Sequence, residues 1–178
     1  MSVLPAERIP LLNHARFELN RRRQCSVVPQ LWSLLDSVKD PELPVLSLWD
    51  LGILQDIQQA QDLVTVVITP TYSGCPAIEV MAEDIECSLR EHGVTEVKVE
   101  TRLSPAWTTD WLTESGKRAL RDYGIAAPGR CGSDRVSVNC PQCGSERTEL
   151  LSEFSATACK ALYRCRSCAE PFDYFKAL

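Results

Sequence analysis

The sequence predicts a small mixed-sheet sandwich of the α/β (α+β) class, followed by a zinc-ribbon-like knuckle with four cysteines. Two observations support this prediction. Residues 27–103 show helical and strand-like apolar spacing in the order α-β-β-α-β, which is typical of helices packed on one face of a short mixed sheet. The C-terminal part instead contains two Cys-x-x-Cys pairs with twenty-one residues between them. We expect a flexible extension over residues 1–26, an α/β domain over 27–127, and a linker with the ribbon over 128–178.

The first helix is expected over residues 27–38, where apolar side chains recur at helical spacing. Pro29 fits its first turn, because the N–H that proline lacks is not needed there. The segment Asp40-Pro41-Glu42-Leu43-Pro44 ends this helix, since the residue before a proline avoids the α region. Residues 45–54 are interpreted as a strand and turn around Asp50-Leu51-Gly52.

Residues 63–69 are almost wholly apolar or β-branched and predict a buried strand. A helix follows, with Pro76 in its first turn and Gly93 as its C-terminal cap. Its apolar face is formed by Ile78, Met81, Ala82, Ile85 and Leu89. Residues 94–103 alternate as a second strand of the sheet, and residues 113–123 predict a further helix.

The composition indicates a soluble globular protein, with 44% hydrophobic and 24% charged residues. No apolar run approaches the ~20 residues that span a bilayer, and no signal-peptide pattern is visible, so neither membrane insertion nor export is expected. The nine cysteines are an odd number, which suits a reducing cytoplasm better than a disulfide framework. The net charge of −5 and the scattered basic residues argue against nucleic acid as a partner.

The strongest chemical signal is the set of cysteines in the two pairs: Cys140, Cys143, Cys165 and Cys168. Two thiolate pairs can converge on one tetrahedral ion, and zinc, with Zn–S distances of about 2.3 Å, is the ion we expect. Four sulfurs fill the coordination sphere, so the site would be structural. Tetrahedral sulfur also suits iron or an iron–sulfur cluster, and without any metal the cysteines would form disulfides or stay free thiols. Cys131 and Cys159 lie near the pairs and could exchange with these ligands, although four already close a site.

A second candidate site is the loop between the buried strand and the following helix. Cys75 stands just before the expected helix, where N–H groups and the helix dipole favour a thiolate. Thr69 and Thr71 add hydroxyl groups, and Asp40 and Glu42 from the earlier loop add carboxylates. Together these groups could hold iron or the edge of an iron–sulfur cluster transiently. The alternative is that Cys75 is a small buried residue without a chemical role.

Several segments resemble known families over residues 27–176. Three of them resemble the small domain of iron–sulfur assembly factors of the SufT kind: Asp40-Pro41-Glu42-Leu43-Pro44, Asp50-Leu51-Gly52-Ile53, and residues 69–77 with Gly74-Cys75-Pro76. Others are similar to the narrower PaaD family: Pro105-Ala106-Trp107-Thr108-Thr109-Asp110-Trp111, Tyr123-Gly124-Ile125, and residues 157–165 and 170–176. The extension before residue 27 lies outside this pattern. Such chains commonly end in Phe-Lys-Cys, whereas Ala177 follows Lys176 here.

The resemblance implies a bacterial accessory protein of aerobic phenylacetate breakdown. Such a protein would help to assemble iron–sulfur or iron centres in the phenylacetyl-CoA epoxidase, without catalysing epoxidation itself. Its implied partners are the oxygenase and reductase components of that complex. The family's cysteine after glycine corresponds to Cys75, and its two pairs correspond to the four ribbon cysteines.

Two other functions stay open from the sequence. A non-catalytic structural subunit of the complex would use Trp107, Trp111 and residues 172–175 as an interface, although both tryptophans also suit internal packing. An enzyme with Cys75 as nucleophile would need a base, and neither His14 nor His92 is placed to serve. A homodimer through an edge strand of the small sheet also stays open.

Overall fold

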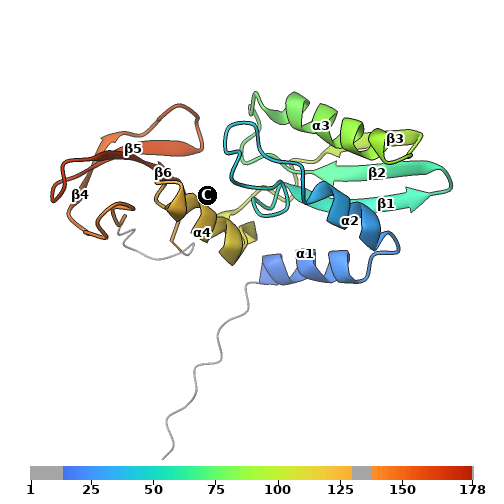
Figure 1. Cartoon of the computed structure of the whole chain (residues 1–178), viewed down its shortest axis with the longest axis horizontal. Coiled ribbons are helices and arrows are strands. Elements are labelled where there is room, and N and C mark those ends of the chain that lie inside the picture. Colours follow the sequence, from blue (N-terminus) through green and yellow to red (C-terminus); the bar gives the residue numbers. More distant parts are fainter. Residues whose placement is uncertain (1–13, 130–137, 178) are drawn as a thin grey trace, which may run out of the picture.

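The computed structural model describes residues 14–129 and 138–177, and it confirms the predicted mixed α/β class with two small sheets. The helices are α1 (His14–Gln24), α2 (Pro29–Leu35), α3 (Ile78–Glu91), the 3₁₀ turn η1 (Thr109–Trp111) and α4 (Glu114–Asp122). The strands are β1 (Leu54–Ala60), β2 (Leu63–Ile68), β3 (Glu96–Thr101), β4 (Thr148–Ser152), β5 (Lys160–Cys165) and β6 (Pro171–Phe175). The two sheets lie at opposite ends of an elongated molecule, with α4 between them (Figure 1).

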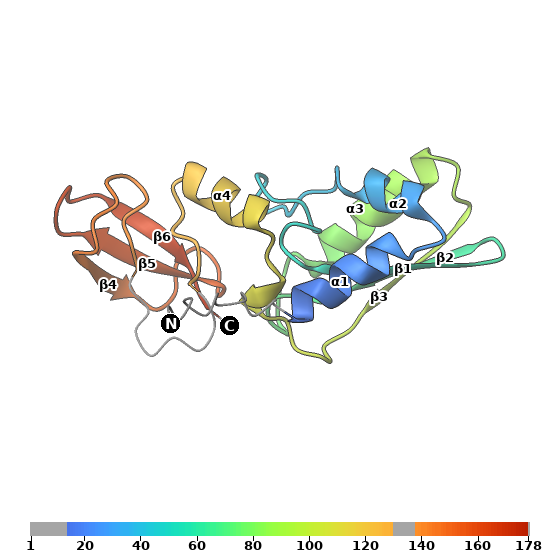
Figure 2. The same cartoon turned by 90° about the horizontal axis from the view of Figure 1, so that it is seen from below.

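The first sheet has the order β1-β2-β3. β1 and β2 form an antiparallel hairpin, whereas β3 runs parallel to β2 after the crossover helix α3. The helices α1, α2 and α3 lie on the same side of this sheet (Figure 2). β1 was not predicted as a strand, because its sequence Leu-Gln-Asp-Ile-Gln-Gln-Ala is mostly polar and its last three residues are exposed.

The predicted apolar face of α3 is the centre of the larger core. Met81, Ile85 and Leu89 are fully buried in it, one helical turn apart. The helix ends as expected at Gly93, which has a φ of +88° and donates its N–H to the Arg90 carbonyl at 3.0 Å. α3 begins at Ile78, three residues after Cys75, and not directly behind it as predicted.

Residues 14–24 correct the expectation of a flexible N-terminal extension. They form α1, in which Leu19 is only 2% exposed. Arg16 holds the helix in place, because its Nη1 donates to the main-chain carbonyls of Trp49 (3.2 Å) and Trp111 (2.9 Å). These contacts join residues far apart in the sequence, so local periodicity could not reveal them. The first thirteen residues of the extension lie outside the described residues.

The turn Asp50-Leu51-Gly52 connects three parts of the chain. The Asp50 carboxylate accepts hydrogen bonds from the hydroxyls of Ser47 (2.9 Å), Thr113 (2.5 Å) and Ser115 (2.8 Å). These hydroxyls outweigh desolvation and hold the pKa of Asp50 below its usual range. Because Thr113 and Ser115 begin α4, this carboxylate fixes the helix that leads toward the ribbon.

The second sheet, with the antiparallel order β4-β5-β6, docks on the α/β domain through its last strand. The N–H of Ala126 donates to the Asp173 carbonyl at 2.8 Å, and the N–H of Phe175 donates to the Ala126 carbonyl at 2.9 Å. Phe175 is fully buried in the larger core, where its ring lies 5.9 Å from that of Trp107. The start of the expected linker is therefore paired with β6.

Gly52 has a φ of +73°, and a Cβ at this position would lie 2.7 Å from the Trp111 carbonyl oxygen. We predict that Gly52→Ala lowers the free energy of unfolding by about 2–5 kcal/mol, from left-handed strain plus overpacking. Gly93→Ala is the matched control, since its φ is +88° but no atom lies within 4 Å of the added Cβ. It should lose only about 1–2 kcal/mol. Equal losses in urea unfolding would show that the contact with Trp111 is unimportant.

Candidate metal centre

The structure brings the four ribbon cysteines together. Their sulfur atoms all lie within 4.8 Å of one another, with 3.7 Å between Cys140 and Cys168 and 3.6 Å between Cys143 and Cys165. A tetrahedral zinc ion with Zn–S distances of about 2.3 Å would place its ligands roughly 3.8 Å apart. A disulfide would need about 2.05 Å. The sulfur positions therefore fit a tetrahedral metal ion, and the four-cysteine cluster suggests structural metal binding.

The two pairs are held by the same backbone device. The N–H of Cys140 donates to the Ser145 carbonyl, and the N–H of Cys165 donates to the Glu170 carbonyl, both at 2.9 Å. Each turn ends on a left-handed residue directly after its second cysteine, Gly144 with a φ of +73° in the first and Ala169 with +66° in the second. The backbone thus points both pairs at one centre.

Hydrogen bonds within the ribbon favour a charged sulfur. The N–H groups of Cys168 (3.5 Å) and Ser167 (3.3 Å) point at the Cys165 sulfur, and they lower the pKa of this thiol to about 6. At Cys168 the N–H of Glu170 opposes desolvation and the neighbouring sulfurs, which together raise the pKa to about 12. Sulfurs packed this closely need a cation before all four can be thiolates.

Cys75 lies in the loop between β2 and α3 and is 9% exposed. Burial raises the pKa of its thiol, the N–H of Ala77 opposes this, and the charges of Glu42 and Asp40 raise it further. The predicted thiolate is therefore wrong for the protein without metal. Desolvation and two carboxylates outweigh the backbone donor, because α3 starts only at Ile78.

Asp40 and Glu42 do lie beside Cys75, as the electrostatic coupling shows. The Asp40 Oδ1 atom accepts the N–H groups of Glu42 (2.9 Å) and Leu43 (2.7 Å), so this residue also folds its own loop. Burial raises the pKa of Asp40, and burial together with Asp40 raises that of Glu42. The surroundings of Cys75 are thus anionic and partly desolvated, which favours a cation.

The two threonines lie on the same loop. Thr69 is buried directly after β2, where its N–H donates to the Ile53 carbonyl at 2.9 Å, and Thr71 is half-buried nearer to Cys75. Their role toward a metal stays a prediction.

Sequence reasoning missed two groups that the ribbon adds beside this loop. Cys159 is 5% exposed and Lys160 is buried at the start of β5. The charge of Cys159 raises the pKa of Cys75, and that of Lys160 lowers the pKa of Asp40. No spacing could have indicated this, because the contact exists only after the ribbon docks. Cys131, also considered near the ribbon, lies outside the described residues.

The tryptophans and the last strand are used for packing. Trp107 and Trp111 are both buried, and the Trp107 Nε1 donates to the Leu51 carbonyl at 3.1 Å. Phe172 and Phe175 are buried as well. The expected partner interface of these residues is therefore wrong, since their side chains face the interior.

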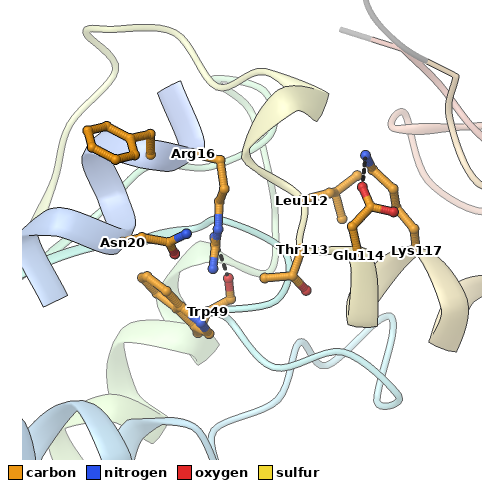
Figure 3. Close-up of a pocket in the computed structure, with 8 residues that line it drawn as sticks. Arg16, Asn20, Trp49, Leu112, Thr113, Glu114 and Lys117 are labelled. Atoms are coloured by element: carbon orange, nitrogen blue, oxygen red, sulfur yellow. Dashed lines mark hydrogen bonds and ion pairs between the residues drawn. The ribbon is translucent and has the colours of Figure 1, made fainter. Parts of the chain in front are cut away.

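A hollow of about 430 Å³ lies where α1 meets the start of α4 (Figure 3). The Arg16 guanidinium lies 3.9 Å from the centre of the Trp49 ring, and burial lowers its pKa to about 10. Lys117 is paired with Glu114 at 2.9 Å on the other side. We assign this hollow a structural role in holding both helices to the Asp50 turn.

No helix in the described part of the chain is long and apolar enough to cross a membrane.

Comparison with known proteins divides the chain into two matched parts. The description "Iron-sulfur cluster assembly protein" matches residues 29–100, and "PaaD zinc beta ribbon domain" matches residues 126–176. The chain is 47% identical over 154 residues to an Escherichia coli protein whose name makes it a subunit of the "Putative 1,2-phenylacetyl-CoA epoxidase". This similarity covers 85% of this chain and 93% of that protein.

A second relative, from Porphyromonas gingivalis, is named "Fe-S protein maturation auxiliary factor". It is 35% identical over 89 residues, which cover 49% of this chain and 84% of that protein. Among solved structures, the chain is similar to the domain of unknown function DUF59 from Bacillus anthracis. That similarity has 23% identity and a TM-score of 0.49, and it covers 58% of this chain and 95% of the solved one.

We predict that Cys143→Ser, or removal of the metal with a chelator, locally unfolds the ribbon. Metal binding supplies roughly 10–16 kcal/mol in zinc-finger peptides, so losing one of four ligands should cost several kcal/mol. Limited proteolysis followed by mass spectrometry should show new cleavage within residues 138–177. Cys25→Ser, at an exposed cysteine, is the control. Unchanged protease resistance in Cys143→Ser would contradict a metal-stabilised ribbon.

We also predict that alkylation of Cys75 accelerates with pH beyond the ordinary thiol range. The thiolate is the reactive form, and burial with Glu42 and Asp40 raises the pKa of this thiol. Glu42→Gln removes a negative charge and should move the midpoint to lower pH, whereas Glu83→Gln on the exposed side of α3 should not. Peptide-level mass spectrometry measures both rates. A wild-type midpoint below about 8.5, the value of a free thiol, would show that the backbone donor dominates.

Proposed function

The chain belongs to the PaaD family, and from this membership we propose that it is a maturation factor for the phenylacetyl-CoA epoxidase. In this proposal it assists the assembly of iron–sulfur or iron centres in the oxygenase or reductase components. The names of the two relatives support the broader role, because one is called an epoxidase subunit and the other an Fe–S maturation factor. Iron or a cluster is then the cargo of the protein.

The observation that carries this proposal is the pairing of a buried thiol with two carboxylates at Cys75. A protonated thiol is a weak nucleophile, yet a metal ion can displace its proton and bind the sulfur. Asp40 and Glu42 raise the pKa of the thiol and attract a cation at the same time. Such a site suits temporary capture and release of iron better than covalent catalysis.

A hollow of about 460 Å³ beside this loop supports cation entry. It lies between the Asp40 loop and α3, and three carboxylates line it: Asp40, Asp84 and Glu91. Converging negative charge raises the local concentration of cations.

For the ribbon we propose a structural zinc ion bound by the four cysteines. Zinc forms more stable complexes than Fe²⁺ with a given ligand set, and tetrahedral sulfur suits it. In this division of labour the zinc site is closed and permanent, while Cys75 handles the exchangeable metal. We also place the protein in the cytoplasm, since free thiols persist in a reducing compartment.

A non-catalytic docking subunit is the second candidate, and one observation favours it. Leu150, Leu151 and Phe154 are about half exposed on and after β4, the edge strand of the ribbon sheet. An exposed apolar edge is suited to binding another protein, either an epoxidase component or a second copy of this chain. Stable one-to-one purification with an active complex would support this function.

We predict that Cys75→Ser lowers the iron and labile sulfide of epoxidase components produced together with the protein. The substitution removes the thiol that would hold the cargo and keeps a side chain of similar size. Cys25→Ser serves as the control, because Cys25 is exposed at the end of α1. Metal and sulfide analysis of the purified components measures the effect. Equal contents with the wild type and with Cys75→Ser would remove the maturation role assigned to this residue.

A further inference from the structure

We infer that Cys159 of the ribbon and Cys75 of the α/β domain are two ligands of one iron(II) site, completed when the ribbon docks. This inference rests on the proposed function, which makes iron the cargo. It adds that the ribbon supplies a ligand, besides its own metal ion.

The packing places Cys159 with Cys75 and not with the zinc-ribbon sulfurs. Both belong to the buried cluster of the α/β domain, although 84 positions separate them. Cys140 and Cys165 belong to the separate cluster of the ribbon. Cys159 is therefore a poor candidate for exchange with the ribbon ligands.

The position of Cys159 is fixed by the docked strand β6. Its carbonyl accepts the N–H of Lys176 at 2.9 Å, directly after Phe175, which is buried against Trp107. Its sulfur lies 3.1 Å from the Thr157 hydroxyl. The same contacts that hold the ribbon on the domain thus bring this thiol to the Cys75 loop.

Both thiols share one set of charged neighbours. Asp40 and Glu42 act on Cys75 and on Cys159, and Tyr72 is coupled to both sulfurs and to Glu42. Burial is the largest cause of the raised pKa of Cys159, as it is for Cys75. Lys160 is the cation in this group, and its Nζ lies 3.1 Å from the Asp173 carboxylate. Two thiols and two carboxylates are a donor set that suits iron(II).

Binding is balanced by proton release. Iron(II) forms two Fe–S bonds, each thiol gives its proton to water, and no electron is transferred. Among the described residues, only the four ribbon sulfurs form a group of three or more ligand atoms within 4.8 Å of one another. Iron would therefore have to draw the donors of this second site closer, with the half-exposed Glu42 side chain free to turn. A site that closes only around its metal also opens readily, as delivery requires.

The test is anaerobic equilibrium dialysis of the reduced, zinc-loaded full chain against iron(II). Zinc should stay in the ribbon, because it binds more tightly than iron(II). We expect Cys75→Ser and Cys159→Ala each to weaken iron binding at least tenfold, and Cys25→Ser to leave it unchanged. Cys159→Ala keeps a small apolar side chain at this buried position, and its melting temperature and zinc content report on folding.

X-ray absorption at the iron edge should count two sulfur ligands in the wild type and one in Cys159→Ala. If Cys159→Ala binds iron as the wild type does while Cys75→Ser does not, the inference is overturned and the proposed function stands. If no variant alters iron binding, the Cys75 site fails as well, and the client experiment decides the maturation role separately. If Cys159→Ala does not fold, the wild-type sulfur count decides: two ligands support the shared site, and one overturns it.

Discussion

The contact between Phe175 and Trp107 holds the ribbon on the α/β domain, and the proposed chemistry depends on it. Phe175 is fully buried, and its strand is paired through Ala126 to the segment that follows α4. The same docking carries Cys159 and Lys160 to the loops of Asp40 and Cys75. Without it, the buried thiol would have only the donors of its own domain.

Burial decides the chemistry of the two cysteine sites in opposite ways. In the ribbon, N–H groups point at Cys165 and favour its thiolate, which prepares the site for a permanent ion. At Cys75, desolvation and two carboxylates outweigh one N–H donor, so the thiol keeps its proton until a cation arrives. The first arrangement suits structure and the second suits exchange.

The sequence predicted the parts of the fold that local signals control. The spacing of Met81, Ile85 and Leu89 located α3, Gly93 located its end, and the two Cys-x-x-Cys pairs predicted the sulfur cluster. These signals operate within a few turns of the chain. Periodicity and turn chemistry were sufficient to find them.

The remaining features depend on contacts between distant segments. α1 is held by Arg16 through carbonyls 33 and 95 positions away, so residues 14–24 looked unstructured in the sequence. β1 lacks a β-branched run and depends on pairing with β2. The neighbours of Cys75 and the direction of its pKa follow from burial and ribbon docking, which spacing does not report.

Anomalous diffraction from crystals grown anaerobically with zinc and iron(II) tests the central claim most directly. Data at the two absorption edges would locate each metal independently. The account predicts zinc among the four ribbon sulfurs and iron beside Cys75. Iron in the ribbon, or no iron within bonding distance of the Cys75 sulfur, would contradict it.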